Sequence, residues 1–259
     1  MKNLFLIITI ISLIFVACKK EEGCTDLSAV NYDAIAEEDD GSCKYNLTIS
    51  FTHTIDENPL EINQMIYTNA AGENYNIQTL RYLISDITLH SDNGSSVLLD
   101  EVHFVTISDT STFNLIIQDL NKPGFSAISF TMGLDAQKNI TNFYLNESFF
   151  PSFVWPSSMG GGYHYMQLEG DYINAFQGYA THTGGTDGED FSFSKNFPLE
   201  INIENTNTTL KINMELNNWY ENPNIINFIT DGIMDDANKQ ALLQANGVTD
   251  VFSVSINDN

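Results

Sequence analysis

Apolar and polar residues alternate with a period of two along much of this chain, and that period favours β-strands. In "NLTISFTHTI", the side chains of Leu47, Ile49, Phe51 and His53 share one face. A strand turns successive side chains to opposite faces, so the pattern predicts one buried and one solvated face. Similar stretches recur towards the C-terminus, for example "VFSVSI" at 251–256. The chain is therefore expected to fold as a β-sheet protein.

Turn and cap signals divide this pattern into elements. Asn93-Gly94 lies between two apolar runs and predicts a hairpin. Residues 197–219 predict a second hairpin. "DDANKQALLQANG" predicts a helix capped by Asp235 or Asp236 and ended by Gly247 in the left-handed conformation. The expected fold class is all-β, an antiparallel β-sandwich or barrel-like domain with long loops and one short C-terminal helix.

The first 17 residues have the composition of a lipoprotein signal peptide. An apolar stretch at 4–15 follows Lys2 and is too short to span a bilayer as a stable anchor. Cys18 then stands where such signals are cleaved and the cysteine is acylated. An ordinary secretory signal with a free cysteine is the alternative. Residues 20–22, Lys-Glu-Glu, resemble the surface-export signal of Bacteroidota lipoproteins, which implies an outer-membrane lipoprotein on the cell surface, or otherwise in the periplasm.

Residues 18–45 are expected to form a small module between the lipid anchor and the main domain. With Cys18 acylated, Cys24 and Cys43 remain as a disulfide pair in an oxidising compartment. The stretch "GCTDLSAVNYDAIAEEDDGSC" resembles the GCTD…NYD…DDGSC motif of secreted Bacteroidota proteins. The β domain is then expected to occupy residues 46–259.

The charge balance excludes one class of partner. The 34 acidic residues against 10 basic ones give a net charge of −24, which repels nucleic acid. An acidic surface attracts cations instead. Asp39 and Asp40 offer the carboxylate oxygens that Ca²⁺ prefers, although a stapled spacer without metal is the other interpretation of their loop.

Two of the five histidines are predicted to face each other. If residues 164–182 form a hairpin centred on Ile173, His164 lies directly opposite His182. Opposite residues on one face have Cβ atoms about 4.5–5.5 Å apart, so both imidazoles reach one metal ion. A register slip of one residue would place them on opposite faces.

A third histidine is expected at the same end of the core. His164 begins an inward-facing run with Met166 and Leu168, and His53 ends one. If the two strands run antiparallel, these histidines meet. Glu169 is either a partner that orients an imidazole or a surface carboxylate. The alternative for each histidine is a hydrogen-bonded structural role.

Six pieces of the chain, in a fixed order, resemble the MbnP-like copper-binding family, in its Bacteroidota lipoprotein branch. They are "FTH" at 51–53, "LRYLISDITL" at 80–89, "ISFTMGLD" at 128–135, "WPSSMGGGYHYMQLEGDY" at 155–172, "GYATHTGG" at 178–185 and "IMDDANKQALLQANGVTDVFSV" at 233–254. The resemblance implies a β-rich extracytoplasmic domain with a mononuclear copper site. By position, its imidazole ligands would come from His53, His164 and His182.

The resemblance also implies a modified residue and a partner. In members of this family a tryptophan oxidised to kynurenine joins the histidines at copper, and a MauG-like di-haem enzyme carries out the oxidation. Trp155 is the candidate here because it lies just before His164; packing is its other possible role. Imidazole sites suit copper first and zinc second.

These observations together predict a lipid-anchored extracytoplasmic copper-binding protein that serves copper acquisition or handling and is not an enzyme. The chain has no GxSxG elbow and no cysteine free to act as a nucleophile. A surface adhesion or glycan-binding β-sandwich is the alternative from a different class. A purely structural surface protein is a third.

Overall fold

A computed structural model describes residues 20–172, 177–205, 208–228 and 233–257 of the 259-residue chain, and two sheets form its main domain. The larger sheet contains β5 (Tyr67–Thr68), β6 (Asn74–Tyr75), β7 (Thr79–His90), β8 (Ser96–Thr106), β10 (Gly124–Met132), β11 (His164–Tyr172), β12 (Gln177–Gly184) and β13 (Phe193–Asn202). The smaller sheet contains β3 (Tyr45–Ile55), β4 (Asn58–Pro59), β9 (Asn114–Leu120), β14 (Thr209–Glu215) and β15 (Phe252–Asn257).

The larger sheet is antiparallel and divides at β7. One edge of β7 pairs with β8 along residues 81–90, in the hairpin that Asn93-Gly94 predicted. The other edge is shared: β11 pairs with residues 79–82, and β10 pairs with residues 84–90. The β11–β12 and β10–β13 pairs therefore diverge from one strand, and the sheet curls into a half-barrel.

The smaller sheet contains one parallel pair, β3 with β14. The predicted hairpin at 197–219 is wrong, because β13 pairs with β10 in the larger sheet while β14 lies between β3 and β15. The chain therefore passes from one sheet to the other between β13 and β14, and the two strands are not neighbours. The predicted mostly antiparallel β fold, sandwich- or barrel-like with a C-terminal helix, is confirmed.

The main core fills the space between the two sheets. It takes Leu47, Ile49 and Phe51 from β3, as the alternation predicted, and Met166 and Leu168 from β11. A second, smaller core lies on the opposite face of the larger sheet. There the long connection 133–163 folds over β7 and β11, and its Phe149, Phe153 and Tyr163 pack with Leu83 and Tyr165.

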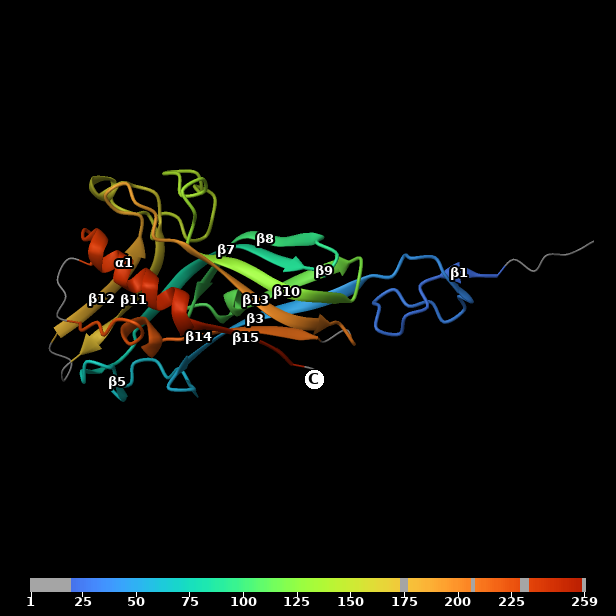
Figure 1. Ribbon diagram of the computed structural model, residues 1–259, viewed down its shortest axis with the longest axis horizontal. Coiled ribbons are helices and arrows are strands. Elements are labelled where there is room, and N and C mark those ends of the chain that lie inside the picture. The colour runs from blue at the N-terminus through green and yellow to red at the C-terminus, as the bar shows by residue number, and fades with distance from the viewer. Residues whose placement is uncertain (1–19, 173–176, 206–207, 229–232, 258–259) are drawn as a thin grey trace, which may run out of the picture.

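The helix α1 (Ala237–Asn246) covers the end of the sheet that carries β11 and β12 (Figure 1). The Asp236 carboxylate caps it by accepting from the backbone N–H groups of Asn238 and Lys239. The expected left-handed stop at Gly247 is wrong: its φ is −57°, and the chain continues into a wider turn, Gly247–Val251, before β15. None of the helices in the described ranges is long and apolar enough to cross a bilayer.

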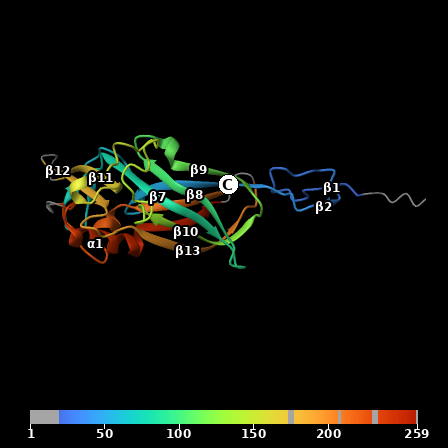
Figure 2. The same cartoon turned by 90° about the horizontal axis from the view of Figure 1, so that it is seen from above.

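The N-terminal module projects from the opposite end of the domain (Figures 1 and 2). It pairs β1 (Glu22–Gly23) with β2 (Glu38–Asp39) and contains the predicted disulfide between Cys24 and Cys43, which is confirmed. Cys18 and the expected signal peptide lie outside the described residues.

The acidic loop of this module turns its carboxylates to its own backbone. Asp39 accepts from the N–H of Gly41 at 3.1 Å, and Asp40 accepts from that of Ser42 at 2.9 Å. Both side chains are exposed. Calcium binding there stays a prediction, and the hydrogen bonds account for the loop without it.

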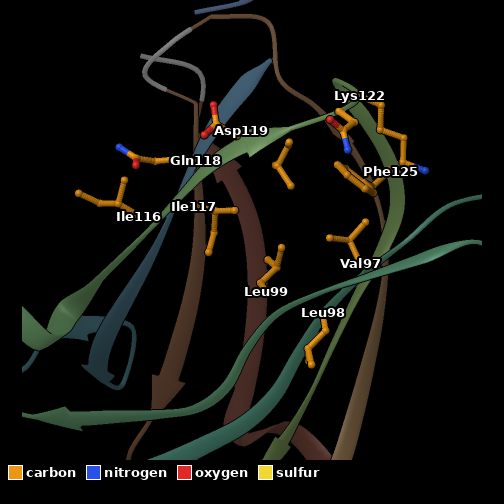
Figure 3. A pocket seen from close by; sticks show the side chains of 11 residues that line it. Val97, Leu98, Leu99, Ile116, Ile117, Gln118, Asp119, Lys122 and Phe125 are labelled. Atoms are coloured by element: carbon orange, nitrogen blue, oxygen red, sulfur yellow. The ribbon is translucent and has the colours of Figure 1, made fainter. Parts of the chain in front are cut away.

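The sandwich is open between β8 and β9. In the described residues β8 pairs only with β7, and β9 only with β3, so a free edge of each strand borders the gap. A groove of about 430 Å³ lies there (Figure 3). Val97, Leu99 and Phe125 are among its apolar lining residues.

Candidate functional site

The structure places His164 and His182 close together, by a register that differs from the predicted one. His182 lies opposite Gln167, and His164 lies opposite Gly184, so the hairpin centred on Ile173 is wrong. Ile173 itself lies outside the described residues. His164 and His182 are diagonal neighbours on one face, a relation that still lets large side chains touch.

A β-bulge at Tyr165 sets this geometry. The pairing shifts by one residue between His164 and Met166, which turns their side chains to opposite faces of the sheet. Met166 faces the main core, and His164 faces the second one. The prediction that His164 shares a face with Met166 and Leu168 is therefore wrong.

The two imidazoles are in contact and each carries an unused nitrogen. Their ring centroids are 4.9 Å apart and the rings are perpendicular. The Nδ1 atoms of His164 and His182 are both buried and have no hydrogen-bond partner. A buried polar atom without a partner costs free energy, so such atoms mark either strain or a ligand position.

Glu169 orients one of these rings. Its Oε1 lies 2.7 Å from Nε2 of His182. Glu169 can reach this ring because it follows Gln167, the residue opposite His182, by two positions and so shares its face of the sheet. The carboxylate holds the proton on Nε2 and leaves the lone pair on Nδ1, the arrangement found behind metal-bound histidines. The same hydrogen bond is the main cause that lowers the pKa of Glu169, so this carboxylate stays charged at neutral pH.

Trp155 and Phe153 cover the pair from the long connection. Backbone hydrogen bonds from His164 N to Phe153 O and from Trp155 N to Gly162 O join this segment to the start of β11. The indole is fully buried, 4.7 Å from the His164 ring, and its Nε1 has no partner. Gly162 takes a φ of +84°, and the Asn139 side chain fills the space beside it.

Two further polar side chains complete this face. Arg81, Gln167 and His182 stand opposite one another on β7, β11 and β12, so they form a row across three strands. Sequence reasoning missed Arg81 and Gln167. The available signal for Arg81 was that it is the single arginine of the chain, placed in an apolar strand.

His53 is not brought to this pair. Its Nε2 lies 3.0 Å from the hydroxyl of Tyr82, and its ring packs edge-on against Phe113. Tyr82 is paired with Met166 and faces the main core, whereas its neighbour Arg81 faces the histidine pair. The larger sheet therefore separates His53 from His164.

Electrostatics keep His164 neutral. Burial is the main cause that lowers its pKa to about 3, with smaller electrostatic contributions from His182 and Arg81 and an opposing one from Glu169. A neutral imidazole has a free lone pair, which metal coordination requires.

The pH dependence of stability is expected to include a contribution from His53, which the control variant below isolates. Burial lowers its pKa from 6.5 to about 4. Between these values the unfolded chain binds a proton that the folded chain does not, so folding weakens as pH falls and the contribution is complete above 6.5. The loss is up to about 1.4 kcal/mol per pH unit. Chemical denaturation of metal-free protein from pH 7 to 4 measures it.

The matched control for this effect is His53→Gln, which keeps a partner for Tyr82 and does not titrate. The difference in unfolding free energy between the variant and the wild type should change across pH 6.5–4 in favour of the variant. A constant difference would contradict the assignment, because the carboxylates titrate alike in both proteins.

Within the described ranges, no three His, Cys, Asp or Glu side chains come together as a cluster able to hold a metal ion. The candidate centre is therefore the histidine pair with Trp155 beside it. Its residues fit a copper ion in two respects: the two buried Nδ1 atoms lack partners, and imidazole is a preferred donor for copper.

Exposed aromatic side chains do not gather in the described part of the chain. Tyr32 belongs to the N-terminal module and Phe143 to the long connection, while both tryptophans are buried. The glycan-binding alternative needs an exposed aromatic platform, and these positions offer none.

Fold and site together define a mostly β protein with a buried imidazole pair beneath a long loop. Known proteins share this fold. The family model MbnP matches residues 44–237, three quarters of the sequence, and the chain belongs to this family. The fold is similar to that of MbnP from Methylosinus trichosporium, with a TM-score of 0.55 and 10% identity over 83% of this chain and 99% of that one. No curated protein matches.

Proposed function

We propose that this protein is an extracytoplasmic, lipid-anchored copper-binding protein that serves copper acquisition or handling and is not an enzyme. The observation that carries the proposal is the contact between His164 and His182, each with a buried Nδ1 that has no partner. Family membership supports copper as the metal, and the disulfide fits an oxidising compartment. Zinc is the second choice of metal.

The chain's own residues prepare the site in three ways. Glu169 fixes the tautomer of His182, so the lone pair of that ring is on the buried side. Burial keeps His164 unprotonated. Phe153 and Trp155 cover the rings, which limits access of water. Copper bound there would supply redox chemistry, and Trp155, whose indole lies beside the His164 ring, would be the residue that a di-haem partner of the MauG type oxidises.

Metal analysis of purified protein tests the proposal. The wild-type chain should bind stoichiometric copper, and His164→Ala with His182→Ala together should abolish that binding, because both donor atoms are lost. Competition with zinc ranks the two metals. Equal, low copper contents in wild type and double variant would rule the site out.

His53→Gln is the matched control, because His53 is also a buried histidine but lies on the other side of the sheet. It should keep the copper content of the wild type. Loss of copper in this variant would show that the three-histidine set expected from the sequence is the true ligand set.

A further inference from the structure

We propose that Arg81 sets the charge selectivity of the histidine pair, favouring the singly charged cuprous ion over the doubly charged Cu²⁺ and Zn²⁺. The inference rests on the proposed copper site and adds a residue that does not ligate the metal. Three features of Arg81 support it: its position, the lack of an ion-pair partner and the permanence of its charge.

The position of Arg81 is fixed by strand register. It lies opposite Gln167, which in turn lies opposite His182, so guanidinium and imidazole belong to one row on the same face. Phe153 lies near both Arg81 and His164. The guanidinium carbon is 5.9 Å from the centroid of the Phe153 ring, and the centroid of that ring is 5.6 Å from that of the His164 ring. The Phe153 ring therefore lies close to both the guanidinium and the imidazole.

The charge of Arg81 is not neutralised by a direct partner. Among the described residues the ion pairs involve lysines and histidines, and none includes Arg81. Its Nε is buried and has no hydrogen-bond partner. Lys138, in contrast, forms a pair with Asp86 at 2.6 Å. The Arg81 charge is thus available to act on its surroundings.

The repulsion between Arg81 and a bound cation grows with the charge of that cation. A guanidinium stays protonated throughout the physiological range, so its field is constant. By Coulomb's law a doubly charged ion experiences twice the repulsion of a singly charged one at the same place. Glu169 supplies one negative charge through its bond to His182 and attracts every bound cation, but the contribution of Arg81 itself still opposes a doubly charged ion twice as strongly as a singly charged one.

The test is Arg81→Gln, which removes the charge and keeps a polar side chain. We measure affinities for Cu⁺, Cu²⁺ and Zn²⁺ separately, with competing chelators, and the reduction potential of the copper-loaded protein. The ratio of the Cu²⁺ affinity to the Cu⁺ affinity should rise about tenfold, and the ratio of the Zn²⁺ affinity to the Cu⁺ affinity should rise by about the same factor. A tenfold change in the ratio of the two copper affinities corresponds to a fall in potential of about 59 mV.

Two controls separate charge from packing. Arg81→Lys keeps the charge and should retain the wild-type preference. Lys211→Gln removes a positive charge from β14 in the other sheet and should leave all three affinities unchanged. If Arg81→Gln fails to fold, Arg81→Met, whose long apolar side chain can still pack on Phe153, takes its place.

Failure of this inference differs from failure of the copper site. If the site is wrong, wild type and all Arg81 variants bind no copper. If the site is right and the inference is wrong, Arg81→Gln binds copper with the wild-type ratio of affinities, or Arg81→Lys behaves like Arg81→Gln. An increased preference for Cu²⁺ in Arg81→Gln alone supports the proposal.

Discussion

Replacing Gln240 by Leu is expected to lower the free energy of unfolding by about 3 kcal/mol or more, because three buried backbone groups lose their partner. The side chain of Gln240 lies on α1 and is fully buried. Its Nε2 donates to the carbonyl oxygens of His182 at 2.8 Å and Ile233 at 2.9 Å. Its Oε1 accepts from the N–H of Gly184 at 3.2 Å.

The position of Gln240 explains why the effect should extend to the site. In the described residues β12 pairs with β11 along one edge only. On the other edge Gln240 takes the place of a neighbouring strand, at the two residues that flank Thr183. Its loss frees the backbone that carries His182. Copper affinity should therefore fall together with stability, even though Gln240 touches neither imidazole.

Gln244 provides the matched control, since it stands one turn later on the same helix. Its Nε2 makes one hydrogen bond to a backbone carbonyl, that of Ser192, at 2.8 Å. Gln244→Leu should cost only about 1 kcal/mol and should leave copper affinity unchanged. Chemical denaturation and copper titration of both variants measure the contrast. Equal losses in the two variants would show that Gln240 has no special role at β12.

The features that the sequence predicted correctly depend on residues that are near one another in the chain, and the wrong prediction at 197–219 depends on residues that are far apart. The alternation of Leu47, Ile49 and Phe51 predicted the buried face of β3 because it depends only on neighbours along one strand. The Asn93-Gly94 turn predicted the β7–β8 hairpin for the same reason. The predicted hairpin at 197–219 is wrong because each of its strands pairs with a partner that is distant in sequence. A turn signal carries no information about such distant partners.

The site shows the same limit more sharply. The proximity of His164 and His182 was predicted from a regular ladder of strand pairs, which the hairpin does not have. One extra residue, Tyr165, reverses the face of His164 and separates it from His53. An alternating pattern does not reveal this bulge, because Tyr163 and Tyr165, on either side of His164 in the sequence, are large side chains that can be buried on either face of the sheet. Arg81 and Gln240 escaped notice because their roles depend on contacts across strands and from the helix.

Replacing Gly184 by Ala is expected to displace Trp155 and to cost about 1–3 kcal/mol, the usual range for overpacking a filled core. A Cβ on Gly184 would lie 2.6 Å from Cε3 and 2.7 Å from Cζ3 of the indole, well inside van der Waals contact. Gly184 stands opposite His164, so the missing side chain is what lets the indole lie against the strand and reach the imidazole. The sequence requires glycine here for space.

Gly178 gives the control on the same strand, because a Cβ there would meet its nearest atom at 3.7 Å, an ordinary contact. Gly178→Ala should leave stability and the near-ultraviolet spectrum of the tryptophans close to those of the wild type. Gly184→Ala should lower stability and alter that spectrum.

A double-mutant cycle shows whether the indole is the cause of the cost. In a Trp155→Leu background the smaller side chain can move aside, so Gly184→Ala should cost much less than it does in the wild type. Equal costs in the two backgrounds would mean that the strand, not the indole, resists the methyl group. A reduced cost would show that Gly184 is retained to seat Trp155 against His164, which links a backbone position to the composition of the candidate metal site.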